Sequence, residues 1–487
     1  MATTDFIAAI ELSSSRVSGM AGQKSADGSV KVLAYAFEDA RQFVRKGLIF
    51  NIDKAQAAIN SVINQLEVQL GSSIAKVYVG IGGQSMRTVI NEINREVTGE
   101  EKISQTLIDQ ICDDNREYPI ADMSILDFEP QEYDIEGTLV TDPVGVTGQH
   151  LTARFLNVVA RATMRKNLEQ SLKDANIEYA DIFILPRALS HSVLTENELR
   201  AGCAMVDFGA ETTTVTVFKN NLMRYLVVIP LGGASITRDI TTLQIEEEEA
   251  EEIKLKYGNA FAPLSENEEE QNNVFNLSDG RSISIEQLNN IVESRTTEIL
   301  SNVWNQIQLS GYDDKLLQGI VFTGGACKLP GLEEAFKKIC RSENMKIRIA
   351  LSAQQPLTGI NASINKEGTT NALLGLILMG NENCCKPEPV KPKVAEKPIQ
   401  TADMFENDEN LKEQEEAVRR EIARKEAEEK AQQRLKEEAE KKARREAEKA
   451  EKKKEKSNRG NIFSDFFGRI SNEIFADEEM NDNNTTK

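Results

Sequence analysis

The segment GCAMVDFGAETTTVTVF, Gly202–Phe218, combines two strand patterns around one turn. An apolar run comes first and ends at a turn that contains Gly209, and a second run rich in Thr and Val follows the turn. Apolar and β-branched runs on both sides of such a turn are typical of antiparallel strands. The segment therefore predicts a β-hairpin, and Lys219–Asn221 predicts a further turn after its second strand.

Two further segments share parts of this plan. FIAAIELSSSRVSGMAG, Phe6–Gly22, reads as a strand, a serine-rich turn and a strand, and VKVLAYAF after the Asp27-Gly28 turn reads as a third strand. GIVFTGGACKLPGL, Gly319–Leu332, reads as an apolar strand, Thr-Gly-Gly and a helix. Because the two hairpins lie far apart in the chain and follow the same plan, they predict a duplicated α/β unit.

The turns in these segments carry residues suited to binding phosphate. Glycine allows backbone N–H groups to approach phosphate oxygens closely, and Ser and Thr hydroxyls add hydrogen-bond donors. An acidic residue beside each hairpin turn, Glu11 or Asp207, can hold Mg²⁺ through water. Any one of the segments alone is a weak indication of a phosphate-binding site. All three in this order and spacing are a strong indication.

Together these segments resemble the actin/Hsp70/sugar-kinase superfamily and, within it, the bacterial cell division FtsA family. The resemblance covers roughly residues 5–380 and the layout of the tail. ELSSSR (Glu11–Arg16) resembles the first phosphate loop, DFGAETT (Asp207–Thr213) the second, and Thr323–Ala326 the adenosine loop. The resemblance implies an α/β, actin-like duplicated ATPase fold with an FtsA-type 1C subdomain, followed by a charged linker and a C-terminal amphipathic helix.

The resemblance also implies a site for ATP and Mg²⁺. Glu251 and Lys254, in AEEIKLKYG, match the acid and base that such folds turn toward the ribose and adenine, although alone they also read as an exposed charged helix face. Glu11 and Asp207 would hold Mg²⁺ through water. The implied cofactor-binding residues are Glu11, Ser13, Ser14, Ser15, Arg16, Asp207, Gly209, Ala210, Glu211, Thr212, Thr213, Glu251, Lys254, Gly324, Gly325 and Ala326.

Several positions depart from the superfamily pattern. Glu11-Leu12-Ser13 stands where Asp-x-Gly is favoured, and a carboxylate at Glu211 would repel phosphate unless it points away or Mg²⁺ intervenes. Hydrolysing relatives place an acid or amide on the attacking water, whereas Leu185 or Pro186 stands there in this chain. Neither Asp181 nor His191, which lie nearby in sequence, can be assigned to that role. We therefore predict ATP binding with at most slow hydrolysis, and no catalytic residue is assigned.

The same resemblance divides the chain into subdomains. Subdomain 1C is expected to run from the strand MRTVINEI through the helix SQTLIDQICDDN to the strand LNVVARATM. The expected parts are 1–85 and 165–200 (IA), 86–164 (1C), 201–234 and 313–382 (IIA), 235–312 (IIB), 383–458 (charged linker, disordered or a single helix), 459–476 (amphipathic membrane-targeting helix) and 477–487 (acidic polar tail).

The tail ends in an apolar patch after a highly charged stretch. Acidic residues outnumber basic ones over 401–440, and basic residues outnumber acidic ones over 441–460. On a helix, the large apolar residues of GNIFSDFFGRISNEIF other than Phe475 fall on one side. An amphipathic helix after a basic run suits an anionic membrane surface, and the other interpretation is docking on a protein. The predicted membrane-binding residues are Ile462, Phe463, Phe466, Phe467, Ile470 and Ile474.

Composition narrows the functional classes. The formal net charge of −20 argues against broad nucleic-acid binding. No apolar run approaches the roughly 18 residues that cross a bilayer, and the N-terminus lacks the basic region of a signal peptide. The 6 cysteines show no metal-binding spacing, which favours a reducing, cytoplasmic compartment, and with 2 histidines catalysis by histidine is not expected.

The resemblance implies an ATP-binding, actin-like cell division protein that polymerises at the inner face of the cytoplasmic membrane. It would be a peripheral protein at the division site that binds the C-terminal peptide of FtsZ through subdomain IIB and so anchors FtsZ filaments. It would help to assemble the Z ring, associate with itself in filaments, and recruit later division proteins through 1C. The alternatives are an FtsA-like pilus-assembly adaptor, a small-molecule kinase and a chaperone-like ATPase of the same superfamily.

Overall fold

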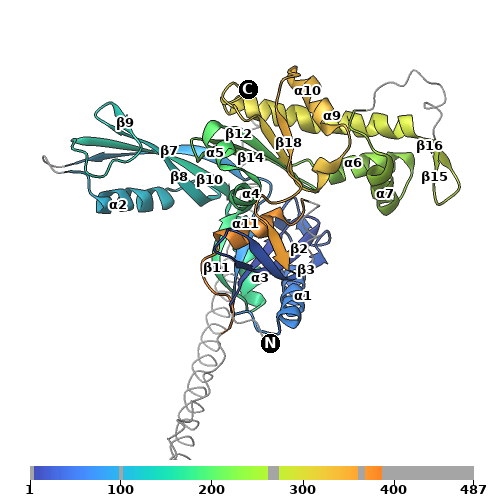
Figure 1. The fold of residues 1–487 in the computed structure, drawn as a ribbon, viewed down its shortest axis with the longest axis horizontal. Coiled ribbons are helices and arrows are strands. Elements are labelled where there is room, and N and C mark those ends of the chain that lie inside the picture. The colour runs from blue at the N-terminus through green and yellow to red at the C-terminus, as the bar shows by residue number, and fades with distance from the viewer. Residues whose placement is uncertain (1–4, 98–101, 262–273, 360–367, 387–487) are drawn as a thin grey trace, which may run out of the picture. The chain divides into compact units, whose positions relative to one another are not determined.

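The computed structural model describes residues 5–97, 102–261, 274–359 and 368–386, which belong to one compact unit, Met1–Lys391 (Figure 1). The amphipathic helix predicted at 459–476, the tail at 477–487 and most of the charged linker predicted at 383–458 lie outside the described residues. The predicted membrane-binding residues lie outside them as well.

Two β-sheets form the framework of this unit. The first has the strand order β11-β6-β1-β2-β3-β19, and the second has the order β18-β17-β12-β13-β14-β7-β10-β8-β9. The strands of the first sheet are β1 (Ile7–Leu12), β2 (Arg16–Lys24), β3 (Val30–Asp39), β6 (Lys76–Ile81), β11 (Glu178–Ile184) and β19 (Leu357–Gly359). Those of the second are β7 (Arg87–Glu96), β8 (Met123–Ile135), β9 (Thr138–Val140), β10 (His150–Arg161), β12 (Cys203–Phe208), β13 (Thr213–Lys219), β14 (Leu222–Ile229), β17 (Ile320–Thr323) and β18 (Ile347–Ile349).

Part of the second sheet repeats the first. In both sheets an antiparallel run of three strands, β1-β2-β3 or β12-β13-β14, continues through its first strand into two parallel strands, β6-β11 or β17-β18. This common order confirms the predicted duplication of an α/β unit. Asn220 and Asn221, both with positive φ, form the predicted turn between β13 and β14.

The two predicted hairpins match in the register of their strand pairs as well as in strand order. The last pair in the first hairpin is Leu12 with Val17, and the last pair in the second is Phe208 with Thr213. Glu11 and Asp207 are each one residue before the end of their strand. Because the two turns have equal length, these two carboxylates occupy equivalent places in the two halves.

Helices cover the sheets and define two lobes. We call the first sheet with α1, α3, α4, α11 and the β4–β5 hairpin lobe I. We call β12–β14, β17 and β18 with α6, α7, α9 and α10 lobe II. The further elements are α1 (Ile52–Leu70), α2 (Gln105–Arg116), α3 (Ala162–Asp174), α4 (Leu185–Val193), α5 (Glu196–Ala201), α6 (Gly233–Ile240), α7 (Glu247–Tyr257), α9 (Ile285–Leu309), α10 (Leu332–Cys340), α11 (Asn371–Met379), the short helices η1 (Thr241–Leu243) and η2 (Gly325–Lys328), and the hairpins β4 (Val44–Arg45) with β5 (Leu48–Ile49) and β15 (Val274–Asn276) with β16 (Ser282–Ser284).

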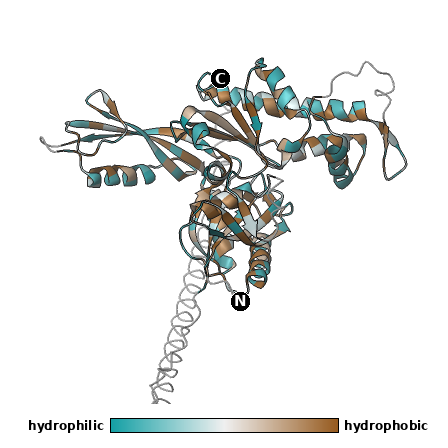
Figure 2. Ribbon diagram, in the orientation of Figure 1, coloured by the Kyte–Doolittle hydropathy of each residue, from teal (hydrophilic) through white to brown (hydrophobic). Residues whose placement is uncertain are grey.

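Local sequence signals set the ends of the long helices. The side chain of Asn51 accepts a hydrogen bond from the Lys54 amide at 3.0 Å and caps α1, which ends at Gly71 with φ of 65°. Ser284 caps α9 in the same way through the Gln287 amide. The apolar strands at the centre of both sheets are coloured brown in Figure 2 and supply most of the buried core.

A separate small core lies under α2. It joins α2 to β7, β8 and β10 through apolar side chains such as Ile111 and Phe155. The stretch LNVVARATM, expected to be one strand, is a strand only to Arg161. Arg161 pairs with Met123, the first residue of β8, so no ladder partner lies beyond it and the chain turns into α3.

Candidate functional site

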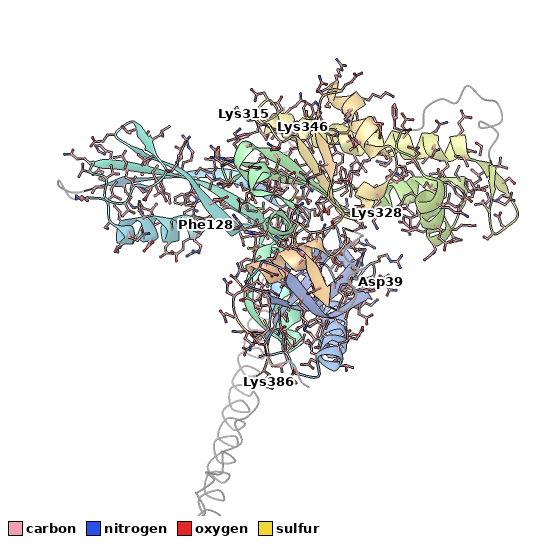
Figure 3. All side chains as sticks on the ribbon, viewed as in Figure 1. Asp39, Phe128, Lys315, Lys328, Lys346 and Lys386 are labelled. Atoms are coloured by element: carbon pink, nitrogen blue, oxygen red, sulfur yellow. The ribbon has the colours of Figure 1, made fainter. Side chains whose placement is uncertain are left out.

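A cavity of about 600 Å³ lies between lobe I and lobe II. The loops that follow β1, β12 and β17 all contribute to its lining, together with α6 and α7. Asp39 from lobe I and Lys328 from lobe II are labelled on its two sides in Figure 3. The three segments selected from the sequence therefore converge on one site.

The first loop is closed by its own serine. The Ser13 amide donates to the Arg16 carbonyl at 2.9 Å, and the Ser13 hydroxyl donates to the same carbonyl at 3.0 Å. A side chain at position 13 is thus accommodated within the turn, although the superfamily favours glycine there. Among the described residues no hydrogen-bond partner meets the amides of Ser14 and Ser15, which leaves these donors for a ligand.

The second loop is tied to the start of α6. The Gly209 amide donates to Thr212 O at 2.9 Å, and the Ala234 amide donates to Ala210 O at 2.7 Å. A Cβ on Gly232 would lie 2.6 Å from the Gly209 carbonyl oxygen, so only glycine allows this close approach. The loop is therefore held in place by backbone contacts on both sides.

Two residues predicted to bind the cofactor point elsewhere. Thr213 is buried and donates its hydroxyl hydrogen to Leu231 O at 2.8 Å. Glu211 Oε2 accepts a hydrogen bond from the Lys46 amide of lobe I at 2.6 Å. Neither residue contributes to the lining of the cavity, whereas the other predicted cofactor-binding residues do.

The third loop packs directly on the second. Gly324 has φ of 89°, and a Cβ there would lie 2.4 Å from Asp207 Oδ1 and 2.5 Å from Phe208 O. The conformation and the space both require glycine. The predicted helix does not start at once, because the short helix η2 follows Gly324 and α10 begins only after Gly331, whose φ is 78°.

The paired carboxylates lie in an environment that disfavours their charge. Burial, and then the nearby charge of Asp207, raise the pKa of Glu11 to about 7, although Arg16 lowers it in part. Burial raises the pKa of Asp207 to about 6. Within the described residues no group of three or more His, Cys, Asp or Glu side chains forms a metal site. Two carboxylates with water and phosphate as further ligands suit Mg²⁺, so the residues present fit this ion.

Lys254 on α7 is buried beside the cavity. Its ammonium group donates to Gly233 O at 3.2 Å, to Thr237 Oγ1 at 2.9 Å and to Glu251 Oε2 at 2.6 Å. Glu251 also accepts a hydrogen bond from Thr237. Lys254 is only 7% exposed, so the alternative of an exposed charged helix face does not describe it.

An apolar wall forms part of the lining near the first loop. Leu185 and Pro186 at the start of α4 contribute to it with Met86, Leu189 and Val228. A Cβ on Gly80 would lie 2.4 Å from Leu185 Cδ2, so this leucine fills the space above β6. His191 and Asp181 do not line the cavity, and burial lowers the pKa of His191.

Some lining residues were not identified from the sequence. Gly47 lies in the β4–β5 turn with φ of 77°, and Gly82 and Gly83 follow β6. Lys-Gly between two short apolar runs and Gly-Gly after a strand are turn signals, but they give no sign of facing the distant loops that follow β1 and β12.

The repeated sheets and the cavity between them define an actin-like ATPase fold. The PilM-PilN type IV pilus biogenesis complex shares this fold with 13% sequence identity and a TM-score of 0.55, and the match covers 77% of this chain and 98% of that one. The chain belongs to the cell division protein FtsA family. The model of the family "Cell division protein FtsA" matches residues 204–368, and that of the "SHS2 domain inserted in FTSA" matches residues 83–159.

Two curated relatives carry the family assignment. FtsA of Porphyromonas gingivalis is 30% identical over 341 residues, which cover 68% of this chain and 70% of the relative. FtsA of Pseudomonas aeruginosa is 30% identical over 338 residues, which cover 68% of this chain and 80% of the relative.

In the part of the chain that the structure describes, no helix is both long and apolar enough to span a membrane.

Proposed function

We propose that this member of the FtsA family binds ATP with Mg²⁺ in the cavity between lobe I and lobe II. We further propose that it polymerises at the inner face of the cytoplasmic membrane and anchors FtsZ filaments there. In this role it helps to assemble the Z ring at the division site and recruits later division proteins. Bound ATP would supply the phosphate charge that Mg²⁺ and the glycine-rich loops recognise.

The observation that supports nucleotide binding is the convergence of three loops from two lobes on one cavity. The amides of Ser14 and Ser15, which meet no hydrogen-bond partner among the described residues, and the hydroxyl of Ser14 can donate to phosphate oxygens. Glu11 and Asp207 line the same cavity and would hold Mg²⁺ through water beside those phosphates. Lys254 and Glu251 line the same cavity beside α6, where they would bind the ribose and base.

The same cavity supports slow hydrolysis at most. Hydrolysing members of the superfamily need a polar group that orients the attacking water. The lining beside the first loop presents Leu185, Pro186 and Leu189 instead. None of these side chains can accept a proton or hold a water, so we propose that ATP acts here mainly as a structural ligand.

The partners in this proposal follow the family assignment. The FtsZ peptide would dock on 235–312, later division proteins on 86–164, and copies of the chain on one another. The apolar face of 459–476 would bind anionic lipid. The boundaries of these subdomains are proposed as well.

Nucleotide binding is tested by titrating the full chain with a fluorescent ATP analogue, with and without Mg²⁺. Lys254→Met removes the buried ammonium group, and we expect it to weaken binding by about tenfold or more, as the loss of a charged hydrogen bond does. Lys256→Met is the matched control, because Lys256 lies on the same helix but outside the cavity lining. Failure of the wild-type chain to bind at millimolar nucleotide, or equal binding by all three proteins, would overturn the proposal.

A further inference from the structure

The carboxylate of Glu211 crosses from the second phosphate loop to the other lobe. Its Oε2 accepts a hydrogen bond from the amide of Lys46, in the β4–β5 turn of lobe I, at 2.6 Å. We propose that Glu211 is an interlobe tie that holds the two phosphate loops together and so sets how fast a nucleotide leaves the cavity. The second part of this inference rests on the nucleotide binding proposed above.

The β4–β5 turn, whose Lys46 amide donates to the carboxylate, is held rigidly within lobe I. Lys46 and Gly47 have φ of 49° and 77°, and the Gly47 amide donates to Ser14 Oγ of the first phosphate loop at 2.9 Å. The Gln84 amide donates to Lys46 O at 2.8 Å. A Cβ on Gly47 would lie 2.3 Å from Gly82 O, so the turn has no room to shift. The Lys46 amide is therefore a fixed point of lobe I.

The loop that supplies the carboxylate is equally fixed in lobe II. Ala210, the residue before Glu211, accepts the Ala234 amide of α6, and Thr212, the residue after it, accepts the Gly209 amide. Successive contacts therefore run from Ser14 through Gly47 and Lys46 to Glu211. A bond from an amide to a carboxylate is stronger than one between neutral groups, which suits a contact that joins the two lobes beside the cavity.

The position of Glu211 favours a role in joining the two lobes over a role in binding the nucleotide. Gly47, Ala210 and Thr212 line the cavity, but Glu211 does not. Its charge is thus turned away from the place where phosphate would lie, which removes the repulsion expected from the sequence. A nucleotide would meet loops that are already in position, and the lobes must break the Lys46–Glu211 bond before they separate.

A weaker attraction also acts between the lobes. The hydrogen bond and the charge of Asp39 in lobe I are the main causes that raise the pKa of the Arg41 guanidinium, and the charges of Glu248 and Glu247 of α7 add to this effect. All four residues line the cavity. Loss of the Glu211 tie should therefore loosen the lobes without separating them completely, so the variant protein remains folded and measurable.

The test compares Glu211→Ala, Glu211→Gln and Glu333→Ala in the full chain. Glu333 is the matched control, because its carboxylate binds Lys337 within one helix, α10. The first readout is hydrogen exchange at the Lys46 amide without nucleotide. We expect about tenfold faster exchange or more in Glu211→Ala, a smaller change in Glu211→Gln, which keeps an acceptor oxygen, and none in Glu333→Ala.

The second readout is the dissociation rate of a fluorescent ATP analogue in the presence of Mg²⁺. We expect Glu211→Ala to release it several-fold faster than the wild type, with Glu211→Gln in between. If hydrogen exchange at the Lys46 amide is unchanged in Glu211→Ala, Glu211 does not tie the lobes together. If that variant releases the analogue at the wild-type rate, the tie does not retain the nucleotide. If Glu211→Ala does not fold, the same two criteria apply to Glu211→Gln. A wild-type chain that binds no analogue would refute the proposed function, while the exchange readout would still test the tie.

Discussion

Glu11 and Asp207 occupy equivalent places in the two halves of the fold, yet they differ in chemistry. Each lies one residue before the end of the first strand of its hairpin, so the duplication brings both to the same cavity. The longer acid stands where the superfamily favours Asp. Burial disfavours the charged forms of both carboxylates, and the charge of Asp207 adds to this effect on Glu11, so the pair is under electrostatic strain until a cation neutralises it.

This strain predicts a pH dependence of stability. The pKa of Glu11 rises from 4.5 to about 7 on folding, so the nucleotide-free folded state binds more protons than the unfolded state between these values. The free energy of unfolding must then fall as the pH rises through this window. Glu11→Gln removes the ionisable group. We expect the free energy of unfolding of this variant, relative to that of the wild type, to be about 1 to 3 kcal/mol higher at pH 8 than at pH 5.

Thermal unfolding of both full-length proteins from pH 5 to pH 8 checks this prediction. Other groups titrate in the same range, so the difference between wild type and Glu11→Gln is the quantity to compare. Parallel pH profiles for the two proteins would contradict it.

The residues around Leu185 predict how slowly ATP would be hydrolysed. With Leu185 and Pro186 in the lining near the first loop, we expect phosphate release by the wild-type chain to stay within about a factor of two of the background without protein. The measurement is phosphate release at saturating Mg²⁺-ATP, on the full chain and in the presence of lipid vesicles. Turnover at the rate of an actin-like filament would refute the prediction.

At the scale of elements, α4 and α11 approach each other closely in lobe I. A Cβ on Gly375 of α11 would lie 1.9 Å from the Ala188 carbonyl oxygen of α4. Both helices carry cavity residues, Leu185 on α4 and Ala372 on α11. The contact between the two helices therefore positions residues that line the cavity and also forms part of the core of lobe I.

This crossing predicts that Gly375→Ala destabilises the protein. Alanine normally stabilises a helix interior by about 1 kcal/mol relative to glycine. Here the added methyl group meets backbone atoms, which cannot rotate away, so we expect a net loss of about 1 to 3 kcal/mol. Chemical unfolding of the variant measures this loss. Ser294→Ala at an exposed position of α9 is the control and should change stability by less than about 0.5 kcal/mol.

At the scale of the whole molecule, the described body holds the first residues of the tail firmly. The Ala75 amide donates to Cys384 O at 2.8 Å, and the Lys386 amide donates to Ser73 O at the same distance. Lys386, labelled in Figure 3, is the last residue that the structure describes. Force applied to the tail would thus be transmitted directly to lobe I.

The membrane role of the tail is tested with anionic lipid vesicles in the presence of ATP. We expect the whole chain to co-sediment with the vesicles and a chain that ends at Ser457 to stay in the supernatant, because the truncation removes the amphipathic segment. Neutral vesicles are the control and should retain much less of the whole chain. Equal sedimentation of both proteins, or of neither, would assign the apolar face of 459–476 to a protein partner.

The sequence predicts those features of this protein that depend on neighbouring residues. The hairpins, the Asn220-Asn221 turn and the strand–Thr-Gly-Gly pattern are local, and the duplicated fold built from them is confirmed. The ends of elements were less predictable: β10 stops at Arg161 because its partner β8 begins opposite it. The assignment of ATP-binding residues and subdomain boundaries stays a prediction.

The sequence alone determined the hairpins β1–β2 and β12–β13 and the family, since backbone conformation and glycine placement are encoded within a few residues. Only the tertiary structure decided which of those residues face the cavity. Glu211 turns away from the cavity toward lobe I because the Lys46 amide, far away in the chain, lies within hydrogen-bonding distance. Gly47 and Gly82 line the site because two distant turns pack together. Such contacts depend on the arrangement of whole strands in space, and no local pattern of residues encodes them.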